Sequence, residues 1–128
     1  MIKLVYCFAK MADISFEEFS RYWHEIHGPI GARIPDLRRL VQSTAVHDPR
    51  DAHVPSFDGM AELWFDDVDA LLRARSSREW QASTEDERHF IDHGRTAYFL
   101  SCERTLVGSE TESPRPSTPP TSGASASG

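Results

Sequence analysis

Six histidines are the residues of this sequence best suited to proton transfer. Because the ordinary pKa of imidazole lies near neutrality, one ring can accept a proton while another donates one, and the pair needs no cofactor. His27 directly precedes Gly28, where it could instead cap the end of a helix. His53 stands in a polar segment, where solvated side chains are common. From the residues alone, catalytic and structural roles stay open for both.

The remaining histidine spacings favour structural roles. His24 precedes His27 by three residues, which places the two about 60° apart around a helix. His89 and His93 have the four-residue spacing of metal-binding helices, with Asp92 between them. The glutamate of an H-E-x-x-H motif is absent and no third ligand stands nearby. We therefore expect no metal site and a solvent-exposed helix face.

Several predicted strands and helices position these side chains. The apolar periodicity and the turn residues predict strands over residues 2–9, 38–47, 59–65 and 96–107, a helix over residues 16–27, a helix following Asp67 and a short helical stretch over residues 79–82. Ser15 with Glu18, and Thr84 with Glu87, have the capping-box spacing that marks helix starts. Gly28 and Pro29 are expected to end the first helix or turn it sharply. The second helix is expected to turn Val68, Leu71 and Leu72 inward.

The order strand-helix-strand-strand-helix-strand is the split βαβ pattern of an α+β, ferredoxin-like sandwich. Helices on one face of such a sheet leave the other face bare, and its apolar residues need a partner. We therefore expect a homodimer in which two sheets pair as an α+β barrel. The long polar loop over residues 47–58 is a candidate lid or cavity wall.

Composition bounds the remaining possibilities. The chain has 128 residues and a net charge of −6, with 20 acidic against 14 basic side chains, so it lacks the basic surface that nucleic acid requires. The first apolar stretch is too short for a signal peptide or a membrane span, and a cytoplasmic protein with no membrane partner is expected. Cys7 and Cys102 fall in predicted strands and are expected to be buried free thiols. Residues 1–107 form the expected domain, and residues 108–128, rich in Ser, Pro and Gly, the expected disordered tail.

Four segments carry a family resemblance: MIKLVYCF, SFEEFSRYWHEIHGPI, HVPSFDGMAELWF and STEDERHFIDH. Together they resemble the EthD domain of the dimeric α+β barrel superfamily, over most of residues 1–107. The chain is similar to muconolactone methylisomerase-like members, in which one histidine near the end of the first helix and another in an H-V-P loop face the substrate. Those positions match His27 and His53. The cysteine of that branch is replaced here by Leu63, so the same lactone isomerisation is not implied.

The resemblance implies a cofactor-independent lyase, cyclase or isomerase in which His27 and His53 exchange protons with a small aromatic, lactone or polyketide-like molecule. Tyr6, Trp64 and Tyr98 are candidate substrate-binding residues among the strand aromatics. Asp86 lies in the STEDE segment, which resembles the acidic motif before the family's last helix; it either orients a histidine or stabilises the helix N-terminus. A cofactor-free oxidoreductase such as a monooxygenase, and a non-catalytic binding protein, remain alternatives, and no nucleotide-binding glycine motif is visible.

Overall fold

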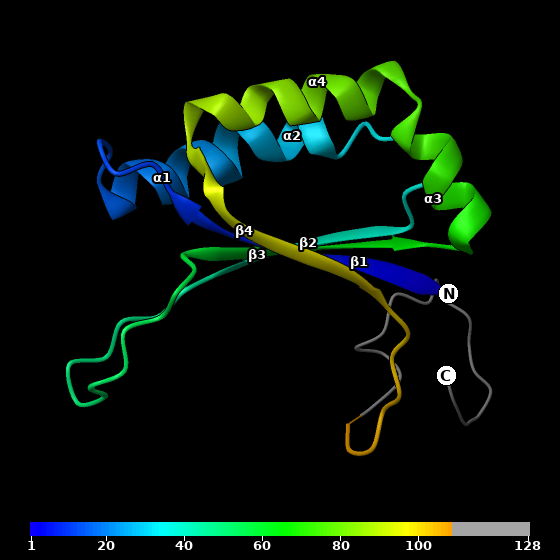
Figure 1. The fold of residues 1–128 in the computed structure, drawn as a ribbon. Coiled ribbons are helices and arrows are strands. Elements are labelled where there is room, and N and C mark those ends of the chain that lie inside the picture. Colours follow the sequence, from blue (N-terminus) through cyan, green and yellow to red (C-terminus); the bar gives the residue numbers. More distant parts are fainter. Residues whose placement is uncertain (109–128) are drawn as a thin grey trace.

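The computed structural model describes residues 1–108 as one antiparallel sheet with helices packed on a single face (Figure 1). In chain order the elements are β1 (Ile2–Lys10), α1 (Phe16–Tyr22), the π-helical turn η1 (Trp23–His27), α2 (Gly28–Gly31), β2 (Arg39–Thr44), β3 (Gly59–Phe65), α3 (Val68–Arg75), α4 (Arg78–Asp86), the 3-10 turn η2 (Glu87–His89) and β4 (Ile91–Ser101). The strand order is β2-β3-β1-β4, and every neighbouring pair is antiparallel. This arrangement is the ferredoxin-like α+β fold, as the sequence predicted.

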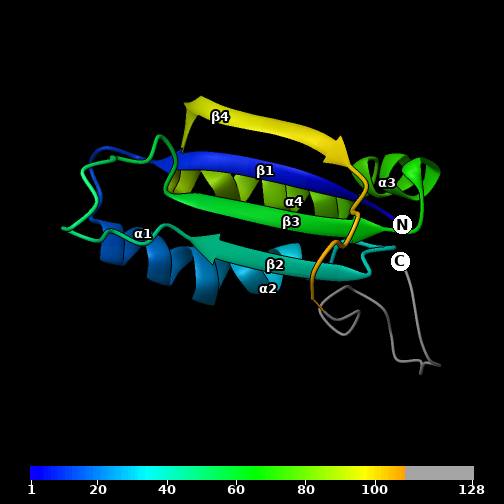
Figure 2. The same cartoon turned by 90° about the horizontal axis from the view of Figure 1, so that it is seen from below.

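The strand register assigns the side chains of the sheet to two faces. Tyr6 on β1 is paired with Ala61 on β3 and with Tyr98 on β4, and because side chains alternate along a strand, these residues share the face beneath the helices. The opposite face, here called the outer face, has no helix on it (Figure 2). Its residues include Lys3, Val5, Cys7, Val41, Met60, Glu62, Trp64 and Phe99.

Aromatic packing joins the sheet to the first helix. The rings of Phe8 and Trp23 meet edge to face at 5.0 Å, and those of Phe19 and Trp23 stack at 5.6 Å. Gly59 begins β3 directly against this cluster, and a Cβ placed there would lie 2.7 Å from the Trp23 ring. Glycine at this position therefore allows the strand and the helix to approach closely.

The first helical segment is longer than the sequence predicted. It begins, as expected, with a complete Ser15–Glu18 capping box, but it continues past Gly28 and Pro29 to Gly31. A proline has no N–H to donate, and a helix tolerates it where the ladder is already altered. Here the Gly28 N–H bonds back five residues to the Trp23 carbonyl, which also accepts a 2.9 Å hydrogen bond from Gln42 of β2.

The segment before β4 also differs from the prediction. Helix α4 is capped by Ser77, so Thr84 lies inside it rather than at a helix start. The chain then enters β4 at Ile91, which pairs with Lys10 of β1, and His93 is consequently a strand residue. Pairing with β1 outweighs the local helical pattern, because propensity is a weak prior against tertiary contact.

Further strand ends and side-chain exposures also differ from the prediction. In α3, which begins at its expected cap Asp67, Val68 and Leu72 are about half exposed, and of the three residues expected to face inward only Leu71 does so. Strand β4 ends at Ser101, so Cys102 lies beyond it and is exposed, whereas Cys7 is half-buried; both are free. Strand β2 is shorter than predicted, covering Arg39–Thr44.

Two regions outside the compact body complete the description. The connection over residues 45–58 extends away from the sheet, on the side opposite the helices (Figure 1). The predicted tail over residues 108–128 lies, apart from Gly108, outside the described residues. Within residues 1–108, no helix is long and apolar enough to cross a membrane.

Candidate active site

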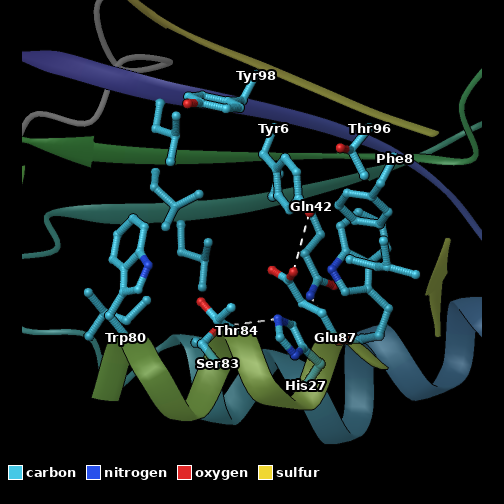
Figure 3. A pocket seen from close by; sticks show the side chains of 18 of the residues that line it. Tyr6, Phe8, His27, Gln42, Trp80, Ser83, Thr84, Glu87, Thr96 and Tyr98 are labelled. Carbon is cyan, nitrogen blue, oxygen red and sulfur yellow. Dashed lines mark hydrogen bonds between the residues drawn. The ribbon is translucent and has the colours of Figure 1, made fainter. Parts of the chain in front are cut away.

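A cavity of about 390 Å³ lies between the sheet and the helices. Most of its wall is apolar, and a small set of polar side chains faces into it, which is the usual composition of a small-molecule site. The polar lining residues are Tyr6, His27, Gln42, Arg75, Ser83, Thr84, Glu87, Thr96 and Tyr98, and the aromatic walls are Phe8, Trp23 and Trp80. Figure 3 shows sheet and helix residues facing one another across this space.

His27 occupies the helix side of the cavity. It is the last residue of the π-helical turn, 9% exposed, and its ring centroid lies 4.8 Å from that of Phe90. A π-helical turn shifts the residues after it around the helix axis and is often found at functional sites. His27 is therefore part of the interior and not a solvated helix cap.

Asp86 contacts the His27 ring at Nδ1. Its Oδ2 lies 2.9 Å from His27 Nδ1, and both side chains are 11% exposed. The other oxygen, Oδ1, accepts a 2.7 Å hydrogen bond from the Tyr22 hydroxyl and lies 3.2 Å from His89 Nδ1. Burial opposes ionisation of Asp86, but the hydrogen bonds from Tyr22, His27 and His89 outweigh it and lower the pKa of the carboxyl.

The Asp86 carboxylate fixes which His27 nitrogen carries a proton. An ionised carboxylate only accepts, so Nδ1 of the neutral ring carries the proton and donates it. Nε2 is then the unprotonated acceptor on the cavity side (Figure 3), where the Ser83 hydroxyl donates a long hydrogen bond of 3.4 Å to it. Burial and the Asp86 carboxylate also raise the pKa of the Tyr22 hydroxyl, to about 12, which keeps it a donor.

The sheet contributes two tyrosines. Tyr6 and Tyr98 are opposed on β1 and β4, and both line the cavity. The Tyr6 hydroxyl donates to Glu87 Oε1 at 3.3 Å, and burial, together with the Glu87 carboxylate, raises the pKa of Tyr6 well above its usual value. The single hydroxyl proton of Tyr6 is therefore engaged with Glu87, whereas the Tyr98 hydroxyl can donate a hydrogen bond to an oxygen atom of a ligand.

Two residues expected at the site lie elsewhere in this chain. His53 is exposed in the 45–58 connection, which contributes no residue to the cavity wall, and its backbone N–H bonds to Asp51. Trp64 belongs to the outer face, where Lys3 and Arg39 lie 5.0 and 4.9 Å from its ring. A single chain thus brings His27, Asp86, Tyr6 and Tyr98 together but leaves out His53 and Trp64.

Several polar residues of the cavity wall were not predicted from the sequence. Ser83 and Glu87 stand three before and one after Asp86, a spacing compatible with one face of a helical segment, but the assumed cap at Thr84 obscured that pattern. Gln42 gave no signal, because the alternation of side chains along a strand does not by itself say which of its two faces turns toward the helices. Within residues 1–108 no group of three or more His, Cys, Asp or Glu side chains is arranged to hold a metal ion.

Comparison with known proteins agrees with this architecture. An EthD family protein from Bacillus halodurans is 25% identical, with a TM-score of 0.68 over 81% of this chain and 99% of its own. A dimeric ferredoxin-like protein of unknown function from Thermobifida fusca is 11% identical, with a TM-score of 0.62 over 80% of this chain and 90% of its own. SnoaB, a cofactor-independent oxygenase from Streptomyces nogalater, is 17% identical, with a TM-score of 0.55 over 82% of this chain and 95% of its own.

The last two structures are too distant in sequence to indicate more than a shared fold. No curated protein shows significant sequence similarity to the chain. The EthD domain model, in contrast, matches residues 12–94, a span that includes His27, Asp86 and most of the cavity wall. The chain belongs to the EthD domain family.

Proposed function

We propose that this protein is an enzyme that transfers protons to and from a small, largely apolar molecule, with His27 as the principal acid-base residue. The observation that carries the proposal is the placement of His27, with Nδ1 held by Asp86 at 2.9 Å and Nε2 on the cavity side. A carboxylate that orients an imidazole and stabilises its protonated form is a recurrent arrangement for general acid-base catalysis.

The proposed reaction is a lyase, cyclase or isomerase step that needs no cofactor. Nε2 of His27 removes a proton from an acidic C–H or O–H bond of the ligand, and Asp86 stabilises the imidazolium that forms. Tyr98 is proposed to donate a hydrogen bond to a ligand oxygen that gains negative charge, and Tyr6, whose proton is held by Glu87, to accept one from a ligand hydroxyl. The same imidazolium then returns the proton at another atom of the ligand or to water.

The cavity also suggests the substrate class. Its volume of about 390 Å³ suits a molecule of one or two fused rings. Phe8, Trp23 and Trp80 offer flat apolar walls, while the tyrosines supply hydroxyl groups. We propose a phenolic, lactone or polyketide-like intermediate as the substrate.

His53 can reach a cavity only if two copies of the chain form a homodimer, because it lies outside the cavity of its own chain. Phe99 of the outer face is 58% exposed, and Val46 and Val54 in the 45–58 connection are almost fully exposed. A second copy packed on the outer face would cover Phe99 and lie beside this connection, which extends in that direction (Figure 1). The related fold from Thermobifida fusca is described as dimeric. We propose that His53 acts from the partner's connection as the second proton-transfer residue.

A probe reaction tests the proposal without knowledge of the natural substrate. Nitrobenzisoxazole opens when a base removes its C–H proton, and the phenolate product is followed by its absorbance. We expect turnover by the wild-type protein and a loss of about a hundredfold or more in His27→Ala, the usual scale for a positioned base. His24→Gln, which changes an exposed histidine of the same helical segment outside the cavity, is the matched control. Equal rates in His27→Ala and His24→Gln would contradict the proposal.

Cofactor-free oxygenation is the second candidate, favoured by the aromatic walls beside a base. SnoaB, which has a similar fold, is described as a cofactor-independent oxygenase. An electron-rich quinol or phenol deprotonated by His27 would react directly with oxygen. Oxygen uptake with a panel of such compounds distinguishes this chemistry from proton transfer alone, and binding without either reaction would indicate a ligand carrier.

A further inference from the structure

Glu87 places a carboxylate in the cavity that the His27 mechanism does not use. It is the first residue of η2, directly after α4, and its side chain is 14% exposed. Figure 3 shows it reaching from the helix side toward Tyr6 on the sheet. Among the residues the structure describes, its Oε2 accepts no hydrogen bond, so this oxygen is available to a ligand.

The other oxygen of Glu87 is the centre of a chain of hydrogen bonds. Oε1 accepts from the Tyr6 hydroxyl at 3.3 Å and lies 2.9 Å from Nε2 of His93. Tyr6 lines the cavity, whereas the His93 side chain is 53% exposed. The contacts therefore run from the interior of the cavity, through one carboxylate, to a histidine side chain that is exposed to water.

A distortion in the sheet positions His93 for this contact. Phe8 of β1 is paired with Thr96 of β4, but the next residue, Ala9, is paired with Asp92. The residues of β4 between these two pairs, including His93, have no partner on β1. Such bulges turn side chains in new directions and are common beside active sites.

We propose that Glu87 is a second proton-transfer group of the cavity and that His93 carries protons between Glu87 and solvent. The inference rests on the proposed function and extends it. A ligand O–H or C–H bond breaks as Oε2 of Glu87 takes the proton. The carboxyl group then turns this proton toward Nε2 of His93, which accepts it when the neutral ring carries its own proton on Nδ1. The imidazolium that forms releases the Nδ1 proton to water. No electrons leave the ligand, and the reverse sequence delivers a proton.

A coloured ligand reports this path directly. Para-nitrophenol is a phenol whose ionisation is visible in its absorbance, so the protonation state of the bound molecule can be read at each pH. Glu87→Gln keeps the size and the acceptor for Tyr6 but removes the charge. Because a neighbouring carboxylate disfavours a phenolate, the pKa of bound para-nitrophenol should fall by about one unit in this variant.

The relay is tested by the speed of proton exchange. After a rapid change of pH, the absorbance of bound para-nitrophenol should relax about a hundredfold more slowly in Glu87→Gln and in His93→Gln than in the wild type, on the scale of a lost proton-transfer group. Added imidazole should restore the rate in His93→Gln, because it replaces a group at the surface, but not in Glu87→Gln. His24→Gln should relax as the wild type does.

These results separate the relay from a structural role. A purely structural Glu87 would leave the pKa of the bound phenol and the relaxation rate unchanged, and that result would overturn the inference. A slow His93→Gln that imidazole fails to restore would overturn the role of His93. If Glu87→Gln does not fold, the imidazole test on His93→Gln still tests the relay, because the His93 side chain lies at the surface and its replacement should not disturb folding. Loss of nitrobenzisoxazole turnover in His27→Ala alongside normal relaxation in both relay variants would leave the proposed function intact and refute only the relay.

Discussion

Replacing Asp86 with asparagine should impair the protein in two measurable ways. The change keeps the size of the side chain and an oxygen for the Tyr22 hydroxyl, but it removes the charge beside His27. An asparagine that turns its NH₂ toward His27 favours the ring tautomer with the proton on Nε2, which is the wrong state for a base on the cavity side. Both turnover and stability should therefore fall.

The size of the effect follows from the contact that is lost. A hydrogen bond to a charged group contributes about 1.5–3 kcal/mol, and at 11% exposure of both side chains solvent screens it little. If the bond strengthens fully in the transition state, that energy corresponds to a loss of about 10- to 150-fold in rate. The same energy lost from the folded state would lower the melting temperature by about 6–20 °C in a domain of this length.

The stability difference should depend on pH in a defined direction. The pKa of Asp86 is lowered in the folded protein, so its contribution to stability is fully present above the unfolded value of about 4. It is lost as the pH falls through the lower, folded value. The gap in melting temperature between wild type and Asp86→Asn should therefore be constant near neutrality and shrink in acid.

Thermal denaturation and nitrobenzisoxazole turnover supply the two measurements. Glu85→Gln is the matched control, because it neutralises the preceding carboxylate of α4, which is exposed and makes no contact with His27. We expect Glu85→Gln to behave as the wild type in both assays. Wild-type turnover and stability in Asp86→Asn would refute the role assigned to the carboxylate.

Three further predictions follow from the packing. His27→Ala should reduce the free energy of unfolding by about 1–3 kcal/mol, in addition to its effect on activity, because it empties a buried position against Phe90. The melting temperature should fall accordingly, and an unchanged value would contradict the burial of His27. Phe99→Glu should convert the proposed homodimer to a monomer in sedimentation experiments, since it places a charge on the outer face; a wild-type monomer at micromolar concentration would refute the dimer itself. Gly59→Ala should cost about 1–3 kcal/mol in denaturant unfolding, because the added carbon would lie 2.7 Å from the Trp23 ring; wild-type stability would show that the ring moves aside without strain.

Much of the fold was predictable because its signals are local. The apolar run of β1, the Ser15–Glu18 capping box and the Asp67 cap each depend on residues close together in the sequence, and each prediction was confirmed. The order of strands and helices then restricted the topology to a ferredoxin-like sheet. His27, which the motif singled out, lines the cavity.

The start of β4 was mispredicted, and with it the setting of His93, because the deciding contacts are distant in sequence. Residues 84–93 have helical spacing, yet Ile91 pairs with Lys10 across the sheet. Sheet pairing supplies hydrogen bonds and buried area that local propensity does not outweigh. Glu87 was consequently read as a capping residue, although it lines the cavity.

The sequence by itself determined which residues could move protons, because that depends on side-chain chemistry alone. Only the tertiary structure decided which of them meet. His27 and Asp86 are 59 positions apart and Tyr6 and Glu87 are 81 apart, yet each pair is within hydrogen-bonding distance. His53, chemically equivalent to His27, lies outside the cavity of its own chain. Such pairings depend on how the helices pack on the sheet, which no pattern of neighbouring residues encodes.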